Sequence, residues 1–105
     1  MESLRIVFEK EILTWKNAEQ KKMFGCPCVK VNGKLFAFLV TNGIVITRLL
    51  ETQKNEVIEK FHAIPYKTQT RTMNKWVQIS YRNHSDFPLI LPYLQISYKN
   101  AMKEK

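Results

Sequence analysis

A chain of 105 residues with 45% hydrophobic content can bury a core without disulfides, so we predict one domain spanning residues 1–105. Charged residues interrupt every apolar run near the N-terminus, which argues against a signal peptide or membrane span and predicts a cytoplasmic protein with no membrane partner. The net charge of +8 favours an anionic partner, although surplus lysine can also serve solubility alone.

The positive charge is concentrated in two segments that contain no acidic residue. These segments lie between Glu19 and Glu51 and between Glu59 and Asp86. They contain Lys21, Lys22, Lys30, Lys34, Arg48, Lys60, Lys67, Arg71, Lys75 and Arg82. All nine acidic residues lie elsewhere, together with the other seven basic ones. A field of one sign along a segment favours binding to nucleic acid.

The first predicted element is a helix over residues 3–15, because apolar side chains recur there at spacings of three and four. Ser3 can cap its start, and Asn17 marks its end. Residues 18–25, AEQKKMFG, fit either a frayed helix tail or a short strand.

A β-hairpin is predicted next, because Asn32-Gly33 stands between two β-rich runs. Its second arm is apolar on both faces and therefore central in a sheet. In that arm strict alternation puts Leu35, Ala37 and Leu39 on one face and Phe36, Phe38 and Val40 on the other. A turn ending at Gly43 then leads to a third antiparallel strand over residues 44–47.

The second half of the chain returns to a helical period over residues 51–62, which predicts a short amphipathic helix. Residues 64–74 show no apolar period, and residues 75–81 alternate as a further strand. At the C-terminus Asp86 can cap a short turn ending at Leu91, with Pro92 at the first position of the main helix. The apolar face of that helix comprises Leu91, Leu94, Tyr98 and Ala101.

These elements predict an α+β fold, in which N- and C-terminal helices flank an antiparallel sheet of four to five strands. The segment MFGCPCVKVNGKLFAFL resembles the M-F-G-x-x-x-x-x-V-x-G-K-x-F-A signature of the N-terminal domain of the TfoX/Sxy competence regulators. KWVQIS and LPYLQISYKNA resemble the closing strand and helix of that family, so the resemblance covers residues 7–102. It implies the MmcQ/YjbR-like superfamily and a frataxin-like, double-wing sandwich that binds DNA through two hairpins. The second, helical domain of full-length TfoX has no counterpart here, so a role in competence is not implied.

The resemblance and the charge together predict a non-enzymatic module that binds nucleic acid or regulates transcription, with DNA as its partner. The candidate nucleic-acid-binding residues are Lys21, Lys22, Lys30, Lys34, Lys67, Arg71 and Lys75. The alternative is a protein-interaction module that assists a transcription factor without contacting DNA.

The cysteines of Cys26-Pro27-Cys28 are interpreted as small apolar residues at the base of the hairpin. A zinc site needs three or four ligands, and His62 and His84 are both distant in sequence. A redox role would need a thiol whose pKa is lowered by neighbouring lysines. No metal or other cofactor is therefore expected.

Catalytic groups are not apparent either, and we predict that the chain is not an enzyme. His84, Ser85 and Asp86 are adjacent and cannot converge as a triad. Glu9 and Glu11 lie about 200° apart around a helix, so they form no acid/base pair.

Aromatic residues on the basic strands can either stack on bases or fill the core, and we favour the core. The residues in question are Phe36, Phe38, Trp76 and Tyr81. Tyr66 and the outward member of the Trp76/Val77 pair are the candidates for exposure.

Overall fold

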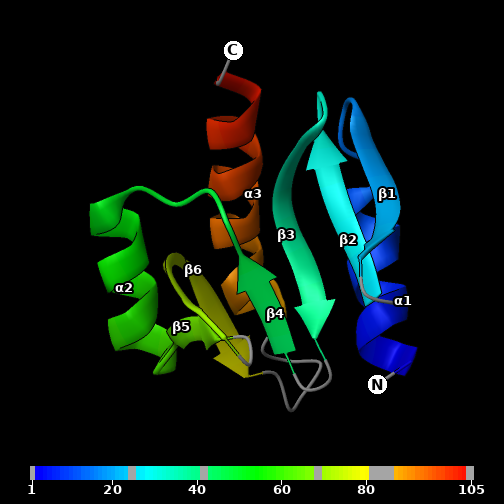
Figure 1. Ribbon diagram of the computed structural model, residues 1–105. Helices are drawn as coiled ribbons and strands as arrows, with labels where there is room; N and C mark the ends of the chain where they lie inside the picture. The colour runs from blue at the N-terminus through cyan, green and yellow to red at the C-terminus, as the bar shows by residue number, and fades with distance from the viewer. Residues whose placement is uncertain (1, 24–25, 41–42, 68–69, 81–86, 104–105) are drawn as a thin grey trace.

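The computed structural model describes residues 2–23, 26–40, 43–67, 70–80 and 87–103. The elements are α1 (Glu2–Ile12), β1 (Ala18–Met23), β2 (Cys26–Val31), β3 (Lys34–Val40), β4 (Gly43–Ile46), α2 (Glu51–Phe61), β5 (Ile64–Lys67), β6 (Thr72–Ser80) and α3 (Phe87–Lys103). The strands form one antiparallel sheet in the order β1-β2-β3-β4-β6-β5. The α+β class is therefore confirmed, with a six-stranded sheet instead of four to five strands (Figure 1).

The two additional strands lie at the two edges of the sheet. Residues 18–23 form β1, which settles the choice between helix tail and strand, because they pair with β2 along their whole length. The sequence does not predict β5, and β6 begins at Thr72 instead of Lys75. An edge strand tolerates Pro65, whose missing N–H removes only one ladder bond.

The predicted hairpin turn is confirmed at Asn32-Gly33, where φ is 53° and 80°. The alternation predicted for the second arm is wrong, because Val29 pairs with Ala37 and Lys30 with Leu35. Phe36 is therefore an extra residue in β3, a β-bulge. The bulge brings Phe36 onto the same face as Ala37, so that both belong to the core beneath the helices.

The main core lies between the sheet and the helices, which all cover the same face. Its buried members come from α1 (Phe8, Ile12), β2 (Val29, Val31), β3 (Phe36, Ala37, Leu39), β4 (Ile44, Ile46), α2 (Val57), β6 (Val77, Ile79) and α3 (Ile90, Leu94, Ala101), among others. The opposite face of the sheet carries a second, smaller cluster, with Cys28, Phe38 and Val45 buried and Leu35, Val40, Tyr66 and Trp76 partly buried. We call this side the helix-free face.

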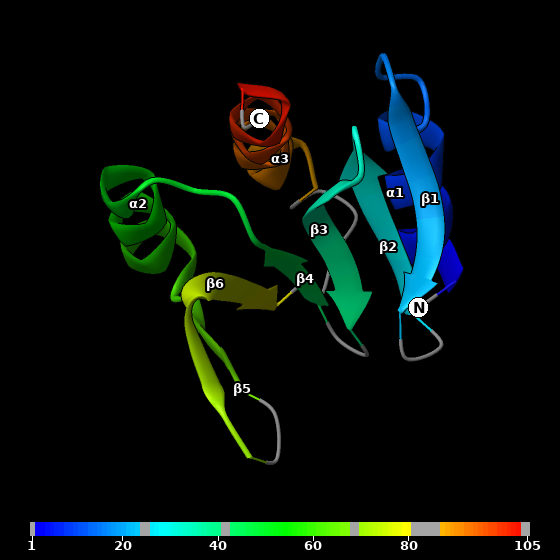
Figure 2. The same cartoon turned by 45° about the horizontal axis from the view of Figure 1, so that its top comes forward.

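The sheet curls toward its helix-free face. Phe38 lies on β3 and Tyr66 on β5, three strand positions apart, which in a flat sheet is about 14 Å. Their ring centroids are nevertheless only 5.2 Å apart. The pairing of β5 with β6 shifts register between Pro65 and Tyr66, an irregularity of the kind that bends a hairpin, and Figure 2 shows the hairpin projecting from the body on the side away from α2 and α3.

Two helices differ from the prediction. α1 begins before Ser3, so Ser3 is not its N-cap. The helix ends at Ile12, and 3₁₀-type backbone hydrogen bonds, such as that from the Trp15 N–H to the Ile12 carbonyl, close its last turn.

α3 continues through Pro92 instead of beginning there. Pro92 is exposed in the early part of the helix, where its ring removes one backbone hydrogen bond while the buried face holds the helix in place. That face centres on Ile90, Leu94, Ser97 and Ala101, whereas Leu91 and Tyr98 are only partly buried.

None of the helices in the described ranges is long and apolar enough to cross a membrane.

The bulge in β3 is fixed by a polar network that reaches α3. The Ser97 hydroxyl, which is fully buried, donates to the Phe36 carbonyl at 2.7 Å and accepts the Arg48 N–H at 3.1 Å. Thr47 Oγ1 donates to the Leu35 carbonyl at 2.8 Å. The Phe36 carbonyl also accepts the Thr47 N–H at 3.2 Å, so the network adds side-chain hydrogen bonds to the two carbonyls next to the bulge and ties them to α3.

Replacing Ser97 with alanine is expected to lower the free energy of unfolding by about 1–3 kcal/mol, because the Arg48 N–H loses its buried acceptor and the Phe36 carbonyl keeps only the Thr47 N–H. Urea denaturation measures the change. The matched control is Gln95→Ala on the exposed side of the same helix, for which the expected change is within about 0.5 kcal/mol. Equal stability of the two variants would show that the network does not hold the bulge.

Candidate nucleic-acid interface

The helix-free face carries two of the predicted basic residues side by side. Val29 and Val31 of β2 face the core, so Cys28 and Lys30 on either side of Val29 face the other way. Lys21 of β1 is the direct partner of Cys28 in the strand register. Lys21 and Lys30 therefore flank Cys28 on the helix-free face.

An acidic residue partly neutralises the positive charge of these two lysines. Glu19 is the strand partner of Lys30, and its carboxylate lies 3.9 Å from Lys21 Nζ. Both side chains of this ion pair are about 60% exposed, so the pair contributes little to stability and can be exchanged for another partner. A phosphate group could take the place of Glu19 at low cost.

The aromatic cluster on the same face contains Phe38, Tyr66 and Trp76. Phe38 is buried and makes edge-to-face contacts with Tyr66 at 5.2 Å and with Trp76 at 5.6 Å. The rings of Tyr66 and Trp76 lie 5.9 Å apart with an interplanar angle of 34°, and both remain partly exposed. Exposure of these two residues agrees with the sequence analysis, and so does the burial of Phe36 and Phe38.

Cys28 is a buried member of this cluster. Burial raises the pKa of its thiol, and this outweighs Lys30 and Lys21, which lower it. The group is therefore a neutral thiol at pH 7, unlike the lowered-pKa thiolate of a redox site. The side chain of Cys26 lies outside the described part of the chain. Among the described residues, no three His, Cys, Asp or Glu side chains are grouped as metal ligands.

Other predicted basic residues lie at two distant places. Lys34 follows the β2–β3 turn, whereas Lys67 and Arg71 lie near the end of the β5–β6 hairpin. Figure 2 shows these two hairpins at opposite ends of the molecule. The side chain of Lys22 and the whole of Arg82 lie outside the described residues.

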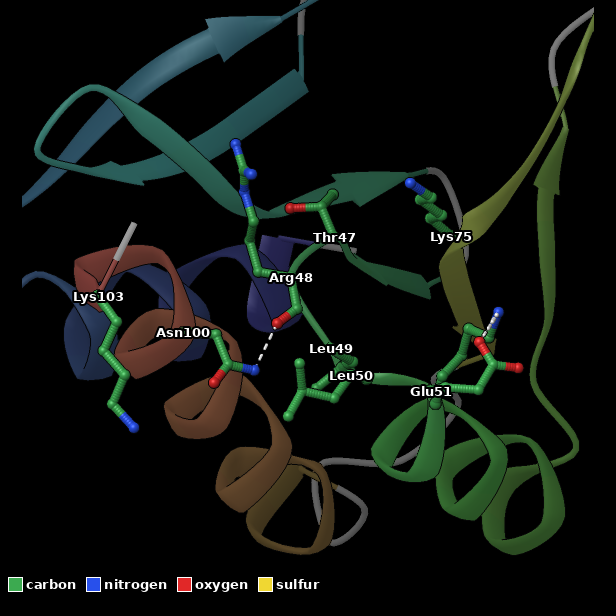
Figure 3. Close-up of a pocket in the computed structure, with 9 residues that line it drawn as sticks. Thr47, Arg48, Leu49, Leu50, Glu51, Lys75, Asn100 and Lys103 are labelled. Carbon is green, nitrogen blue, oxygen red and sulfur yellow. Dashed lines mark hydrogen bonds and ion pairs between the residues drawn. The ribbon is translucent and has the colours of Figure 1, made fainter. Parts of the chain in front are cut away.

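Lys75 lies on the helix side of the sheet, because it shares the alternation of the core residue Val77. There it lines a cleft of about 570 Å³ together with Arg48, Lys54 and Lys103. Figure 3 shows Lys75 and Lys103 on opposite sides of this cleft and the Arg48 guanidinium turned toward the sheet.

The cations of the cleft do not converge on one point. Arg48 Nε donates to the Leu35 carbonyl at 2.9 Å, and Lys54 Nζ lies 3.1 Å from Glu51. Asn100 donates to the Arg48 carbonyl at 2.7 Å, as the dashed line in Figure 3 marks. Arg48 is thus held against β3 and Lys54 within α2, while Asn100, which also donates to Gln53 at 3.1 Å, joins α3 to the start of α2.

The histidines do not form a site in the described residues. His62 is exposed and ends α2 in the left-handed conformation, with φ of 55°. His84, Ser85, Asp86 and Tyr81 lie outside the described residues.

Sequence reasoning misses the contact between Tyr66 and Phe38. The pattern around Tyr66 contains no apolar period, so it predicts no strand there. The sequence does indicate that Tyr66 is an aromatic residue at an exposed position. That indication identifies Tyr66 itself but not the residues that it contacts.

The fold defines a basic α+β protein whose six-stranded sheet is covered by helices on one face and carries aromatic and lysine side chains on the other. No protein-family model and no curated protein matches this chain.

Proposed function

We propose that this protein is a non-enzymatic nucleic-acid-binding module with a regulatory role, and that its helix-free face contacts the phosphates. The observation that carries the proposal is that Lys21 and Lys30 lie on the same face of the sheet as the partly exposed rings of Tyr66 and Trp76. Basic side chains near exposed aromatic rings are the combination that nucleic-acid-binding surfaces use.

The projecting β5–β6 hairpin adds cations at the edge of this surface, with Lys67 turned to the side of the hairpin opposite its neighbour Tyr66. Lys67 and Arg71 lie near its end, and the hairpin also carries Tyr66 and Trp76. A projecting basic hairpin corresponds to one of the two wings that the TfoX/Sxy resemblance implies. The β2–β3 turn lies at the other end of the molecule, so we propose that the helix-free face, and not a pair of wings, is the main binding surface.

The test is a fluorescence-anisotropy titration of labelled DNA at two or more salt concentrations. The phosphate variant replaces Lys21, Lys30, Lys67 and Arg71 with Gln. Each phosphate contact contributes about one unit to the slope of log affinity against log salt, so the slope should fall by up to about four. At roughly 0.1 M salt, affinity should fall by about 100-fold or more.

The control variant removes four charges from the exposed helix layer. It replaces Lys10, Lys16, Lys99 and Lys103 with Gln. Lys54 is not suitable as a control, because it is paired with Glu51. Glu19→Gln is the reciprocal test and should raise affinity by about 1.5- to 5-fold, since it removes a repulsive charge from the binding face. Equal losses in the two four-residue variants, or no binding by the wild type at roughly 0.1 M salt, would contradict the proposal.

The second candidate function is a protein-interaction module that assists a transcription factor. Ile6 of α1 is 53% exposed, and Leu13, seven residues later, is 44% exposed. Leu13 directly follows α1 and its N–H still donates to the Glu9 carbonyl at 3.1 Å, so the two exposed apolar side chains lie on the same side of the helix, with Glu9 and Lys10 between them. A transcription factor retained in a pull-down after nuclease treatment, and lost with Ile6→Glu and Leu13→Glu, would favour this candidate.

A further inference from the structure

We propose that the helix-free face binds single-stranded nucleic acid in preference to duplex, with the rings of Tyr66 and Trp76 stacking on unpaired bases. This inference rests on the proposed function and names its ligand class.

Two rings of the aromatic cluster lie together and in similar orientations. Tyr66 and Trp76 are 5.9 Å apart and inclined by only 34°, so the two rings are close to a common orientation. Both rest against Phe38, at interplanar angles of 87° and 73°. The buried ring of Phe38 therefore supports a platform of two partly exposed aromatic rings.

The platform is ordered before any ligand arrives. Edge-to-face contacts with Phe38 restrict the side-chain rotation of Tyr66 and Trp76 in the free protein. A ring that is already held in place loses less conformational entropy on binding. A base that stacks there gains the full contact at a reduced entropic cost.

A duplex presents no free base faces along its length to such rings. In a double helix each base is stacked on its neighbours, so only its edges are accessible in the grooves. Unpaired bases expose their π faces and stack on aromatic side chains. The curl of the sheet places the rings of Tyr66 and Phe38 on the inner side of a bend, where a flexible single strand can follow the surface.

Two lysines share the face of the sheet that carries the platform. Lys21 and Lys30 lie on the same face as the platform, on β1 and β2, while the platform residues come from β5 and β6. Cys28, next to both lysines, belongs to the same cluster as Tyr66 and Trp76. A strand whose bases stack on the platform can therefore carry its phosphates toward the lysines, the arrangement used by proteins that bind single strands without sequence preference.

The simplest competing explanation is that the cluster serves stability alone, as a small core beneath the β5–β6 hairpin. That explanation predicts that truncating Trp76 changes the melting temperature without changing affinity for nucleic acid in the folded fraction. The stacking proposal predicts a loss of affinity at unchanged salt dependence, because stacking displaces no counterions.

The experiment compares a labelled oligo(dT) strand with a labelled hairpin duplex of mixed sequence, each titrated with wild type, Trp76→Leu, Tyr66→Leu and Trp76→Phe. Wild type should bind oligo(dT) at least about tenfold more tightly than the duplex, the scale of stacking one or two bases. Trp76→Leu and Tyr66→Leu should each lose roughly 5- to 150-fold for oligo(dT), with the salt slope unchanged. Trp76→Phe retains an aromatic face and should keep most of the affinity.

Tryptophan fluorescence gives an independent readout. Oligo(dT) should quench wild-type emission by stacking on Trp76, and most of this quenching should disappear in Trp76→Phe, which still binds. Trp15, the other tryptophan, stacks on Phe36 on the helix side and should not be quenched.

The outcomes separate this inference from the proposed function. Equal or tighter binding of the duplex would overturn the single-strand preference while leaving the nucleic-acid proposal standing. Wild-type affinity in folded Trp76→Leu and Tyr66→Leu would overturn the stacking role. Binding of neither ligand would overturn both proposals.

Discussion

Replacing Gly43 with alanine is expected to lower the free energy of unfolding by about 3 kcal/mol or more. Gly43 begins β4 and pairs with Val40 of β3 and with Ser80 of β6. A Cβ atom at this position would lie 2.2 Å from the carbonyl oxygen of Ile79. Because the obstructing atom belongs to the backbone, no rotamer change can relieve the clash, and β4 and β6 must move apart. In a domain of this size the melting temperature should fall by roughly 12 °C or more.

Gly33→Ala is the matched control, since it adds the same methyl group at a position with open space. Gly33 has φ of 80°, and apart from Gly33 itself and its two chain neighbours no atom lies within 4 Å of the point that the added methyl group would occupy, so the only penalty is the left-handed backbone. That penalty is about 1–2 kcal/mol. Thermal denaturation of both variants measures the difference, and a Gly43→Ala variant as stable as Gly33→Ala would show that β4 and β6 are not packed so closely.

The second large effect is expected for Phe38→Ala, which should lower the free energy of unfolding by about 3–5 kcal/mol. Phe38 is 2% exposed and contacts both Tyr66 and Trp76. Truncation removes the ring that joins β3 to the β5–β6 hairpin across the helix-free face. Urea denaturation measures the loss.

Leu89→Ala provides the comparison for Phe38→Ala, because Leu89 is 61% exposed on α3 and its truncation should change stability by less than about 0.5 kcal/mol. If Phe38→Ala were no more destabilising than Leu89→Ala, the helix-free cluster would contribute nothing and the curl of the sheet would need another cause. Phe38→Leu should fall between the two, because it keeps part of the buried apolar area.

The sequence predicts elements with strong local signals. The Asn32-Gly33 turn and the α2 helix over 51–61 are predicted correctly, because positive φ at a turn and a helical apolar period depend on residues close together in the chain. The α+β class follows from the same elements. Local signals fail at Pro92, because the buried face of α3 outweighs a single missing hydrogen bond.

The candidate site is predictable only in part. The sequence shows the two basic segments directly, and it marks Tyr66 and one member of the Trp76/Val77 pair for exposure. It cannot tell that Lys21 and Lys30 share a face while Lys75 lies on the other one. The face on which a strand residue lies depends on register, and register is set by a partner strand distant in the chain.

The sequence by itself determined the hairpin turn, the helical periods and the distribution of charge. Tertiary structure decided whether residues 18–23 became a strand, because that polar segment has no period of its own and is ordered by pairing with β2. It also decided the face of Phe36, through the bulge opposite Val29 and Lys30. The contact of Phe38 with Tyr66 arises only when four strands curl together, a cooperative property of the sheet that no short window of sequence contains.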